Sequence, residues 1–315
     1  MSAAGASQDS EHASVAAVVV TFNRREILRR SIESLGRQTH PVDEVIVVDN
    51  ASSDGTRTML AEGFPLVTTL SLPENAGPGA AFAIGMKHAY EQGHRWAWLF
   101  NDDDLAKPEA LEILLEWCDR LAGEHVAMVG CWNQVRSGRV MYNGSLWRGG
   151  HRYRPTEEGA PAYRIDVLRF SGTLVALDAI PVVGVPRGDF FFMIEEVEYC
   201  LRMSKAGRAN FVVPLPLVTA LHEGSPSSAS PPWRGYYQTR NHLAMAIEHR
   251  SVKEVFWCLT RETKFMTAAV LFNDKKWQRA RLRMLGAWHA VIGKSGKTLD
   301  PVTGRWLDGT SIRRS

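Results

Sequence analysis

Residues 15 to 132 alternate short apolar runs with amphipathic stretches, and this alternation limits the possible folds more than any other feature. VAAVVVT (15–21) is rich in β-branched residues, as is typical of a strand buried on both faces. Residues 24–38 instead carry Ile, Leu, Ile and Leu on one helical face. The pattern predicts further strands at 44–49, 66–72, 96–100 and 126–132, and helices at 77–93 and 108–121. Such alternation predicts an α/β fold, with a mostly parallel central sheet and helices on both faces.

Polar side chains follow several of these strands where the apolar run stops. In sheets of this kind ligands bind at the carboxyl ends of the strands, so we expect these side chains to meet on one rim. They are Thr21, Asn23, Asp49, Asn50, Asn75, Asp102 and Asp104. Their shared position favours a binding site over unrelated structural caps.

Composition limits the class of protein and its compartment. The chain has 315 residues and a formal net charge of +3, which is too small to indicate a nucleic-acid partner. Its four cysteines are far apart, which argues against a disulfide framework and fits a reducing cytoplasm. No apolar run approaches the roughly 18 residues that a membrane span needs. Residues 1–14 are polar, and we predict a disordered start rather than a signal peptide.

The string LFNDDDL (99–105) ends an apolar run with three adjacent carboxylates. Asp102 and Asp104 are two residues apart, so in an extended segment both side chains lie on one side. Two carboxylates placed in this way could hold Mg²⁺ or Mn²⁺ together with phosphate oxygens and water. Acidic residues also commonly end strands and cap helices, so the pair alone does not distinguish a metal site from a structural one.

A second acidic pair lies in FFFMIEEVEYC (190–200), where three phenylalanines lead into Glu195 and Glu196 at an expected helix start. Acidic residues in a first helical turn complement the helix dipole, which explains Glu198 well and Glu195 adequately. It does not explain why aromatic residues bury the helix entry. A partly desolvated carboxylate there would gain proton affinity and suit a general base.

Two later motifs add polar side chains. His222 follows an apolar strand and precedes a Gly-Ser loop, which suits a metal ligand better than a core residue. In WRGYYQTRNH (233–242), Tyr237, Arg240 and Asn241 lie near the opening of an expected helix, where they could cradle an anion. Arg240 could equally pair with a carboxylate.

Two segments have other character. Residues 133–165 are rich in Gly, Arg and aromatic residues and predict an insertion with β-hairpins. Residues 255–293 are helical, with Trp and Phe interleaved with Lys and Arg. This segment fits either a helical layer on the domain or a helix pair lying against an anionic membrane surface.

Taken together, these motifs resemble the inverting glycosyltransferases of family 2, which have a GT-A fold. The resemblance runs from about residue 15 to residue 241 and includes EVIVVDNASSDGT, ENAGPGAAFAIGM, WAWLFNDDD, EEVEYCLR and LHEGS. Within the family the chain looks most like actinobacterial galactofuranosyltransferases that initiate galactan synthesis, and rhamnosyltransferases share most of the pattern. The resemblance implies a GT-A catalytic domain over 15–250, with a nucleotide-sugar half (15–132) and an acceptor half (133–250). A basic-aromatic helical region (251–315) follows.

The resemblance also implies a role for each motif. The nucleotide-sugar would contact Thr21, Asn23, Asp49, Asn50, Asn75, Gly77, Gly79, Asp102 and Asp103. A Mn²⁺ or Mg²⁺ ion would bind Asp102, Asp104 and His222. The acceptor would contact Gly172, Trp233, Tyr237, Arg240 and Asn241. Glu196 would be the catalytic base, but the chain has Glu195-Glu196 where Glu-Asp or Asp-Asp is commoner, which leaves open which glutamate serves.

The implied activity is metal-dependent transfer of galactofuranose from UDP-galactofuranose, with inversion, to a polyprenyl-diphosphate-linked glycan in cell-wall polysaccharide synthesis. The enzyme would be cytoplasmic and peripheral at the inner face of the cell membrane. A rhamnosyltransferase using dTDP-rhamnose is the alternative. A nucleotidyltransferase is disfavoured because VVVTFNRRE lacks a Gly-rich loop. A non-catalytic sugar-nucleotide-binding module is disfavoured because the DxD aspartates, Glu196 and His222 are all present.

Overall fold

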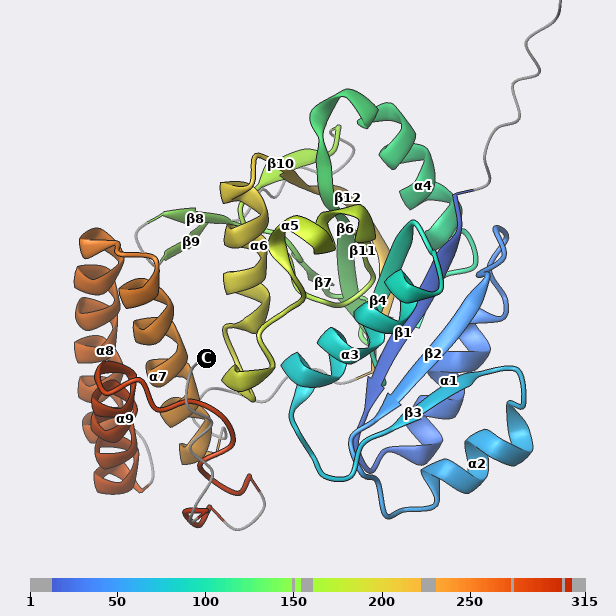
Figure 1. Cartoon of the computed structure of the whole chain (residues 1–315). Coiled ribbons are helices and arrows are strands. Elements are labelled where there is room, and N and C mark those ends of the chain that lie inside the picture. Colours follow the sequence, from blue (N-terminus) through green and yellow to red (C-terminus); the bar gives the residue numbers. More distant parts are fainter. Residues whose placement is uncertain are drawn as a thin grey trace, which may run out of the picture.

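The computed structural model describes residues 13–148, 151–153, 161–221, 231–272, 275–301 and 304–307. A mixed sheet forms its centre, and three long helices from the C-terminal part of the chain pack together on one side of the molecule (Figure 1). The predicted disordered start, residues 1–14, falls almost entirely outside the described residues.

The strands and their order define the sheet. In the described part of the chain the main sheet has the order β10-β12-β6-β11-β4-β1-β2-β3, with β5 paired to β12 and β7 to β6. These strands are β1 (Val15–Thr21), β2 (Glu44–Asp49), β3 (Thr68–Ser71), β4 (Trp96–Asn101), β5 (Asp104–Ala106), β6 (Val126–Val135), β7 (Val140–Met141), β10 (Tyr163–Ile165), β11 (Thr173–Ala176) and β12 (Ala209–Ala220). A separate hairpin joins β8 (Leu146–Arg148) and β9 (His151–Tyr153).

The N-terminal strands β3, β2, β1 and β4 are mutually parallel, as are β6 and β12. Between these two parallel groups, β11 runs antiparallel to both β4 and β6. The predicted α/β fold with a mostly parallel central sheet is confirmed.

The helices lie between and after the strands. They are α1 (Arg25–Leu35), α2 (Thr56–Gly63), α3 (Pro78–Glu91), α4 (Ala110–Arg120), α5 (Ile180–Val183), α6 (Glu195–Lys205), α7 (Pro232–Glu248), α8 (Val252–Phe272) and α9 (Lys276–Val291). Short 3₁₀ turns occur at Ala122–Glu124, Leu177–Ala179 and Gly188–Phe190. Helix α2 was not predicted, because eight residues after a Gly-containing turn carry little periodic signal.

The continuous apolar character of β1 is explained by burial on both faces. Ala16, Val18 and Val20 pack into one core cluster, together with residues of α3 and α6. Val15, Ala17 and Val19 pack into the other cluster, with residues of α1 and α4. Alternate side chains of one strand therefore enter two cores, and the prediction that helices cover both faces is confirmed.

The C-terminal helices α7, α8 and α9 form a bundle. Gly286 of α9 lies so close to α7 that an added Cβ would be 2.6 Å from the Tyr236 carbonyl oxygen. Helix α7, placed with the catalytic domain in the sequence-based division, thus packs with the two helices that follow it. Among the described helices, none is both long enough and apolar enough to span a bilayer.

Candidate active site

The carboxyl ends of β1, β2 and β4 bring polar residues together as predicted. In the parallel register Thr21 is opposite Asp49, and Val20 is opposite Asn101. The chain leaves β4 at Asn101 and passes directly into Asp102. Residues from three distant parts of the sequence thus share one rim of the sheet.

The three adjacent aspartates have different surroundings. Asp102 is buried, and its carboxylate accepts hydrogen bonds from Thr21 Oγ1 at 2.8 Å and from Arg24 Nη1 at 3.0 Å. Asp103 is more exposed and pairs with the same guanidinium nitrogen at 3.2 Å. Asp104 is buried, and its Oδ2 accepts hydrogen bonds from the backbone and side-chain nitrogens of Asn101.

Burial changes the proton affinity of this cluster. It raises the pKa of Asp102 to about 6, although the charge of Arg24 and the hydrogen bond from Thr21 oppose the shift. Burial and the neighbouring charge of Asp103 raise the pKa of Asp104 to about 7. Desolvated carboxylates in mutual repulsion are stabilised in their ionised form by a cation.

The residues present fit a divalent metal ion by this chemistry, because hard oxygen ligands and excess negative charge occur together. Among the described residues, however, no group of three or more His, Cys, Asp or Glu side chains is arranged to hold a metal. His222, the predicted third ligand, lies outside the described residues.

The predicted donor-binding residues on the loops after β1, β2 and β3 hold these loops in shape. Asp49 Oδ1 accepts a hydrogen bond from the Ser52 amide, and Oδ2 pairs with Arg57 at 3.0 Å. Asn23 Oδ1 accepts from the Ser53 amide at 2.7 Å. The structure therefore shows a pre-shaped rim.

Asn50 and Asn75 act in the same way at the start of α3. The Asn50 Oδ1 atom accepts a hydrogen bond from the Ala76 amide, and the Asn75 Oδ1 atom accepts from the Gly77 amide.

Three predicted site glycines make room for the protein's own chain. Gly77 has φ +85°, and an added Cβ would be 1.9 Å from the Phe191 carbonyl oxygen. At Gly79 it would be 2.8 Å from the Arg187 carbonyl oxygen and 3.3 Å from Glu195 Cβ. At Gly172 (φ +69°) it would be 2.4 Å from Val218. In the structure, the space that a side chain would need at each glycine is filled by protein, and Gly77 and Gly79 pack against residues 187–195. Contact of Gly77 and Gly79 with a donor stays a prediction.

The two glutamates at the start of α6 differ sharply. Glu195 is buried, its Oε2 has no hydrogen-bond partner, and burial together with the Glu196 charge raises its pKa to about 8. Glu196 is partly exposed, and its Oε1 accepts a hydrogen bond from the Phe170 amide at 3.1 Å. Glu195 is thus held neutral near pH 7, whereas Glu196 is oriented and accessible.

The segment before these glutamates has an unusual backbone. Phe191, Met193 and Ile194 all have positive φ, at 61°, 71° and 75°. Non-glycine residues in this region cost about 1–3 kcal/mol each and persist only where surrounding contacts impose them.

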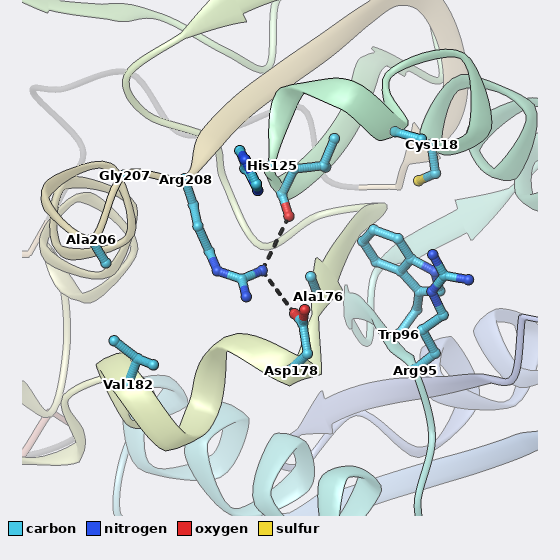
Figure 2. Close-up of a pocket in the computed structure, with 12 residues that line it drawn as sticks. Arg95, Trp96, Cys118, His125, Ala176, Asp178, Val182, Ala206, Gly207 and Arg208 are labelled. Carbon is cyan, nitrogen blue, oxygen red and sulfur yellow. Dashed lines mark hydrogen bonds and ion pairs between the residues drawn. The ribbon is translucent and has the colours of Figure 1, made fainter.

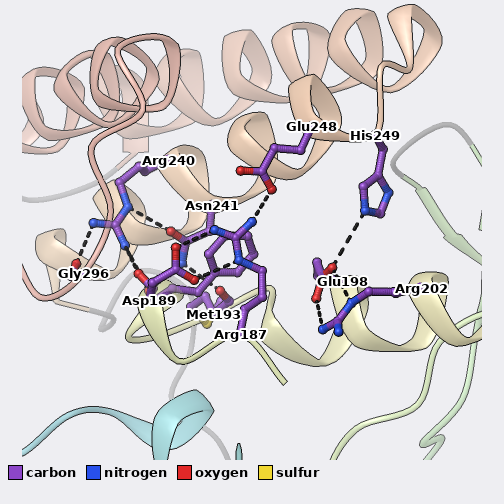
Figure 3. A network of polar contacts seen from close by, with 11 residues as sticks. Arg187, Asp189, Met193, Glu198, Arg202, Arg240, Asn241, Glu248, His249 and Gly296 are labelled. Atoms are coloured by element: carbon purple, nitrogen blue, oxygen red, sulfur yellow. Dashed lines mark hydrogen bonds and ion pairs between the residues drawn. The ribbon is translucent and has the colours of Figure 1, made fainter. Parts of the chain in front are cut away.

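Arg240 and Asn241, predicted to bind the acceptor, supply those contacts instead (Figure 3). Asn241 Nδ2 donates to the carbonyl oxygens of Phe190, Phe192 and Met193 at 2.8–2.9 Å. Arg240 donates to the carbonyls of Phe190 and Gly296. Both side chains are about 1% exposed, so neither offers a free group to a diphosphate. For these two residues the structure replaces an acceptor contact with a buried clamp on the 190–194 segment.

Tyr237 and Trp233, also predicted to contact the acceptor, differ in accessibility. Tyr237 is fully buried, and its hydroxyl donates to the Leu299 carbonyl oxygen at 3.0 Å. Trp233 is partly exposed and packs edge-on against Phe192, with ring centroids 5.1 Å apart. Only Trp233 of the two is accessible.

A cavity of about 600 Å³ joins the parts of the site. Asn101 lines it from the acidic rim, and Glu195 and Glu196 line it from α6. The remaining lining residues come from α3 and from five segments after residue 132: Pro78, Phe82, Trp147, Arg169, Phe192, Met193, Ile194, Arg234, Gln238 and Arg261.

A chain of hydrogen bonds links the acidic rim to Glu196. Asn101 Nδ2 donates both to Asp104 Oδ2 at 3.2 Å and to the Phe170 carbonyl oxygen at 3.4 Å. The Phe170 amide in turn donates to Glu196. One backbone residue therefore sets the position of the glutamate relative to the strand that carries the aspartates.

Sequence reasoning missed several of these residues. Arg24 directly follows the rim residue Asn23, so its position after β1 could have predicted that it belongs to the site. Arg57 lies on the unpredicted helix α2. Trp147, Arg169 and Arg261 gave no signal, because no local pattern shows which side chains line a cavity built from distant segments.

A second cavity, of about 590 Å³, lies at the opposite ends of the strands (Figure 2). It is lined by Arg95 and Trp96 at the start of β4 and by Arg208 at the start of β12. Arg208 is already paired with Asp178 at 2.7 Å. This cavity contains neither the acidic rim nor the glutamates.

The parallel sheet with an acidic rim, next to a cavity with a helix-borne carboxylate, defines a glycosyltransferase fold of the GT-A class. Residues 16–168 match the model of "Glycosyl transferase family 2", and the chain carries a domain of that family.

Comparisons with known proteins agree with this class. Galactofuranosyltransferase GlfT1 of Mycobacterium tuberculosis is 33% identical over 199 residues, which cover 62% of this chain and 66% of that protein. The match thus spans just under two thirds of this relative. The dTDP-rhamnosyl transferase RfbF of Shigella flexneri is 23% identical, over 80% of this chain and 88% of its own.

Solved structures show the same fold. S. aureus TarS 1-349 in complex with UDP-GlcNAc has a TM-score of 0.58 at 16% identity, covering 88% of this chain and 81% of its own. GalNAc-T7 with UDP, GalNAc and Mn²⁺ has a TM-score of 0.63 at 13% identity, covering 90% and 57%.

Proposed function

We propose that this chain transfers a sugar from a nucleotide-sugar to an acceptor hydroxyl with inversion at the anomeric carbon. The observation that carries the proposal is a cavity lined both by Asn101, the residue directly before the three aspartates, and by Glu196. A donor held at the rim would present its anomeric carbon to an acceptor hydroxyl deprotonated by Glu196.

The donor in this proposal is UDP-galactofuranose, bound along the rim by the loops that carry Thr21, Asn23, Asp49 and Asn50. The similarity to the M. tuberculosis galactofuranosyltransferase supports the sugar, and the fold shared with TarS supports the nucleotide. The acceptor is a polyprenyl-diphosphate-linked glycan in cell-wall polysaccharide synthesis.

Mn²⁺ or Mg²⁺ would be held by Asp102 and Asp104, with His222 as the third ligand. When bound, such an ion offsets the negative charge of the departing nucleoside diphosphate. The raised pKa values of both aspartates support this assignment, because two buried carboxylates need a compensating cation to remain ionised.

Glu196 is the base in this mechanism. The Phe170 amide fixes its Oε1 atom, so the carboxylate is oriented before the acceptor arrives. It removes the proton from the acceptor hydroxyl, whose oxygen attacks the anomeric carbon from the face opposite the diphosphate. Glu195, neutral near pH 7, does not compete for this proton. One base and one displacement invert the configuration.

The nucleotide specificity is tested by calorimetric titration of the protein with UDP and with dTDP, each with Mn²⁺ and with EDTA. We expect tighter binding of UDP, and a loss of that binding in EDTA. In Asp104→Ala the UDP affinity should no longer depend on Mn²⁺. The absence of binding by either nucleotide would contradict the proposed function.

Rhamnosyl transfer from dTDP-rhamnose is the second candidate, favoured by the similarity to RfbF over 88% of that protein. Preference for dTDP over UDP in the same titration would select it.

We place the enzyme on the cytoplasmic face of an anionic membrane through the outer face of α8 and α9. Both helices expose an apolar stripe: Val252, Phe256 and Leu259 on α8, and Trp277, Met284, Trp288 and Val291 on α9. An apolar groove of about 180 Å³ between α8 and α9 is lined by Leu259 and Met284, and its floor includes Thr239 and Leu243 of α7. Exposed Lys264, Lys275, Lys276 and Arg281 accompany the stripes. Exposed apolar and basic side chains on neighbouring helices suit anionic headgroups and the acyl boundary beneath them.

A further inference from the structure

The cavity beside Glu196 carries more positive than negative charge. Three arginines line it, namely Arg169, Arg234 and Arg261, and the only acidic residues of its lining are Glu195 and Glu196. Burial and the Glu196 charge raise the pKa of Glu195 to about 8, so near pH 7 the lining holds three guanidinium groups and one carboxyl group besides the neutral Glu195, while Glu262, outside the lining, pairs with Arg261. A cavity with this excess attracts an anion.

Of the three arginines, Arg234 gives the strongest evidence for an anion site. Its guanidinium lies over the Phe192 ring at 5.0 Å and over the Trp233 ring at 5.8 Å, which fixes its direction. Among the described residues it has no carboxylate partner within ion-pair distance. The Arg234 side chain is exposed, but partial desolvation and repulsion by the Arg24 charge lower its pKa, so a nearby anion would stabilise its charged form.

The other two arginines come from different elements. Arg169 precedes β11, and only its backbone makes hydrogen bonds within the described part of the chain. Arg261 of α8 pairs with Glu262 at 3.1 Å, but its buried Nε has no hydrogen-bond partner. Each of these two guanidinium groups therefore has N–H donors that bond to no described residue.

We propose that Arg169, Arg234 and Arg261 form a phosphate-binding subsite for the acceptor, taking the diphosphate of an isoprenoid-linked sugar. This inference rests on the proposed function and adds the residues that hold the acceptor's diphosphate. Guanidinium groups suit phosphate because they donate paired hydrogen bonds. In this proposal the donor's diphosphate lies at the acidic rim and the acceptor's lies at the three arginines, which line a cavity that the rim residue Asn101 also lines.

Helix α8 connects this subsite to the outer apolar face. Arg261 lines the cavity, whereas Leu259, two residues earlier, lines the groove shared with α9. An isoprenoid tail could therefore remain in the membrane surface while its diphosphate is bound at the cavity and the sugar reaches Glu196. Trp147, Phe192 and Met193 add an apolar wall.

The test uses geranyl diphosphate and its uncharged counterpart geraniol, titrated calorimetrically into the full chain with and without saturating UDP and Mn²⁺. We expect geranyl diphosphate to bind in both conditions, and to bind more tightly than geraniol. Arg234→Gln should weaken geranyl diphosphate about tenfold or more while leaving UDP affinity within about twofold. Arg261→Gln should have the same direction of effect. Arg30→Gln, which removes one exposed charge from α1, is the matched control and should change neither affinity.

Four results would overturn the subsite. These are no binding of geranyl diphosphate by a protein that binds UDP, equal binding of geraniol, displacement by UDP, and equal loss of UDP affinity in Arg234→Gln. Displacement by UDP, or an equal loss of UDP affinity, would assign Arg234 to the donor-binding site. Failure of the unmodified protein to bind UDP would instead reject the proposed function, and the titration without nucleotide would still report on the arginines. A thermal melt of each variant confirms that it is folded.

Discussion

Glu195 and Glu196 are chemically identical neighbours that the fold makes different. The first turn of α6 directs Glu195 against Gly79, where an added Cβ would be 3.3 Å from the Glu195 Cβ. The same turn leaves Glu196 partly exposed beside the cavity, with one oxygen held by the Phe170 amide. A single step along the helix thus separates a neutral buried carboxyl from an accessible base.

Glu196→Gln should lower the turnover rate by about 10²–10⁴-fold, because it removes the proton acceptor while keeping the shape of the side chain. The affinity for UDP should remain within about twofold by calorimetry. Glu195→Gln is the matched variant and should retain most of the activity near pH 7. The opposite pattern, an active Glu196→Gln and an inactive Glu195→Gln, would assign the base to Glu195.

The buried Glu195 also predicts a pH dependence of stability. Its pKa is about 8 in the folded chain, against an ordinary value of 4.5. Between these values the folded state keeps a proton that the unfolded state has lost, so the free energy of unfolding falls as pH rises through this window. Glu195→Gln lacks this titration. The melting temperature of the variant should therefore rise relative to that of the parent between about pH 5 and about pH 8.5.

The control for that measurement is Glu62→Gln, at an exposed position of α2. It should not reproduce the trend. A melting-temperature difference for Glu195→Gln that stays constant across the window would show that Glu195 is ionised in the folded protein.

At the scale of elements, the turn before α6 is held by α7. Three non-glycine residues with positive φ lie within residues 191–194, and the Asn241 amide group bonds three carbonyls of the same turn. Asn241 of α7 thus acts on the glutamates without lining the cavity, and it is a positioning residue for the base.

Asn241→Ala should lower stability by about 1–3 kcal/mol, because buried carbonyls lose their donors. It should also lower the maximal rate while leaving UDP affinity unchanged, since the Asn241 side chain bonds the turn before α6 and no residue of the rim. Ile247→Ala, on the exposed side of the same helix, is the control. A variant that loses stability but keeps the parent's rate at a temperature where it is folded would show that the turn does not need this clamp.

At the scale of the molecule, the α7–α9 bundle joins a buried side to an accessible outer face. Helix α7 contacts the 190–194 turn, whereas Trp277 and Trp288 of α9 are 77% and 58% exposed. Large exposed aromatic residues accompanied by basic ones are typical of a surface with a partner. Because the proposed acceptor is linked to a lipid, we propose that a membrane is the partner of this surface.

The double variant Trp277→Ala/Trp288→Ala should lose several-fold in binding to vesicles that contain anionic lipid, measured by co-sedimentation. Added salt should weaken the binding of the parent protein, because the basic side chains act through screened charges. Leu66→Ala removes a 95% exposed apolar side chain elsewhere and is the control. Equal binding of the parent protein to neutral and anionic vesicles would show that the basic residues do not contribute to membrane binding. Equal vesicle binding by the parent protein and the double variant would show that the two tryptophans do not contribute.

Much of the fold and the acidic rim was predictable because the underlying signals are local. The alternation of β-branched runs with amphipathic helices reports burial on two faces, and strand ends in a parallel sheet meet at one edge whatever the rest of the chain does. Thr21, Asp49 and the 102–104 aspartates were placed together for that reason. The aromatic residues that precede Glu195 and Glu196 predicted that the catalytic base is one of these two glutamates.

The tertiary structure alone decided which side chains are free to act. Arg240 and Asn241 have the chemistry of an anion site, but carbonyl groups of residues 48 or more positions away accept their hydrogen bonds and enclose them. Arg169, Arg234 and Arg261 have no shared motif, yet three separate elements bring them to one cavity. Local sequence carries residue type and periodicity, whereas burial and hydrogen-bond partners are set by segments distant in the chain. For this reason the sequence determined the class of site, whereas the fold determined which of the candidate side chains are accessible at that site.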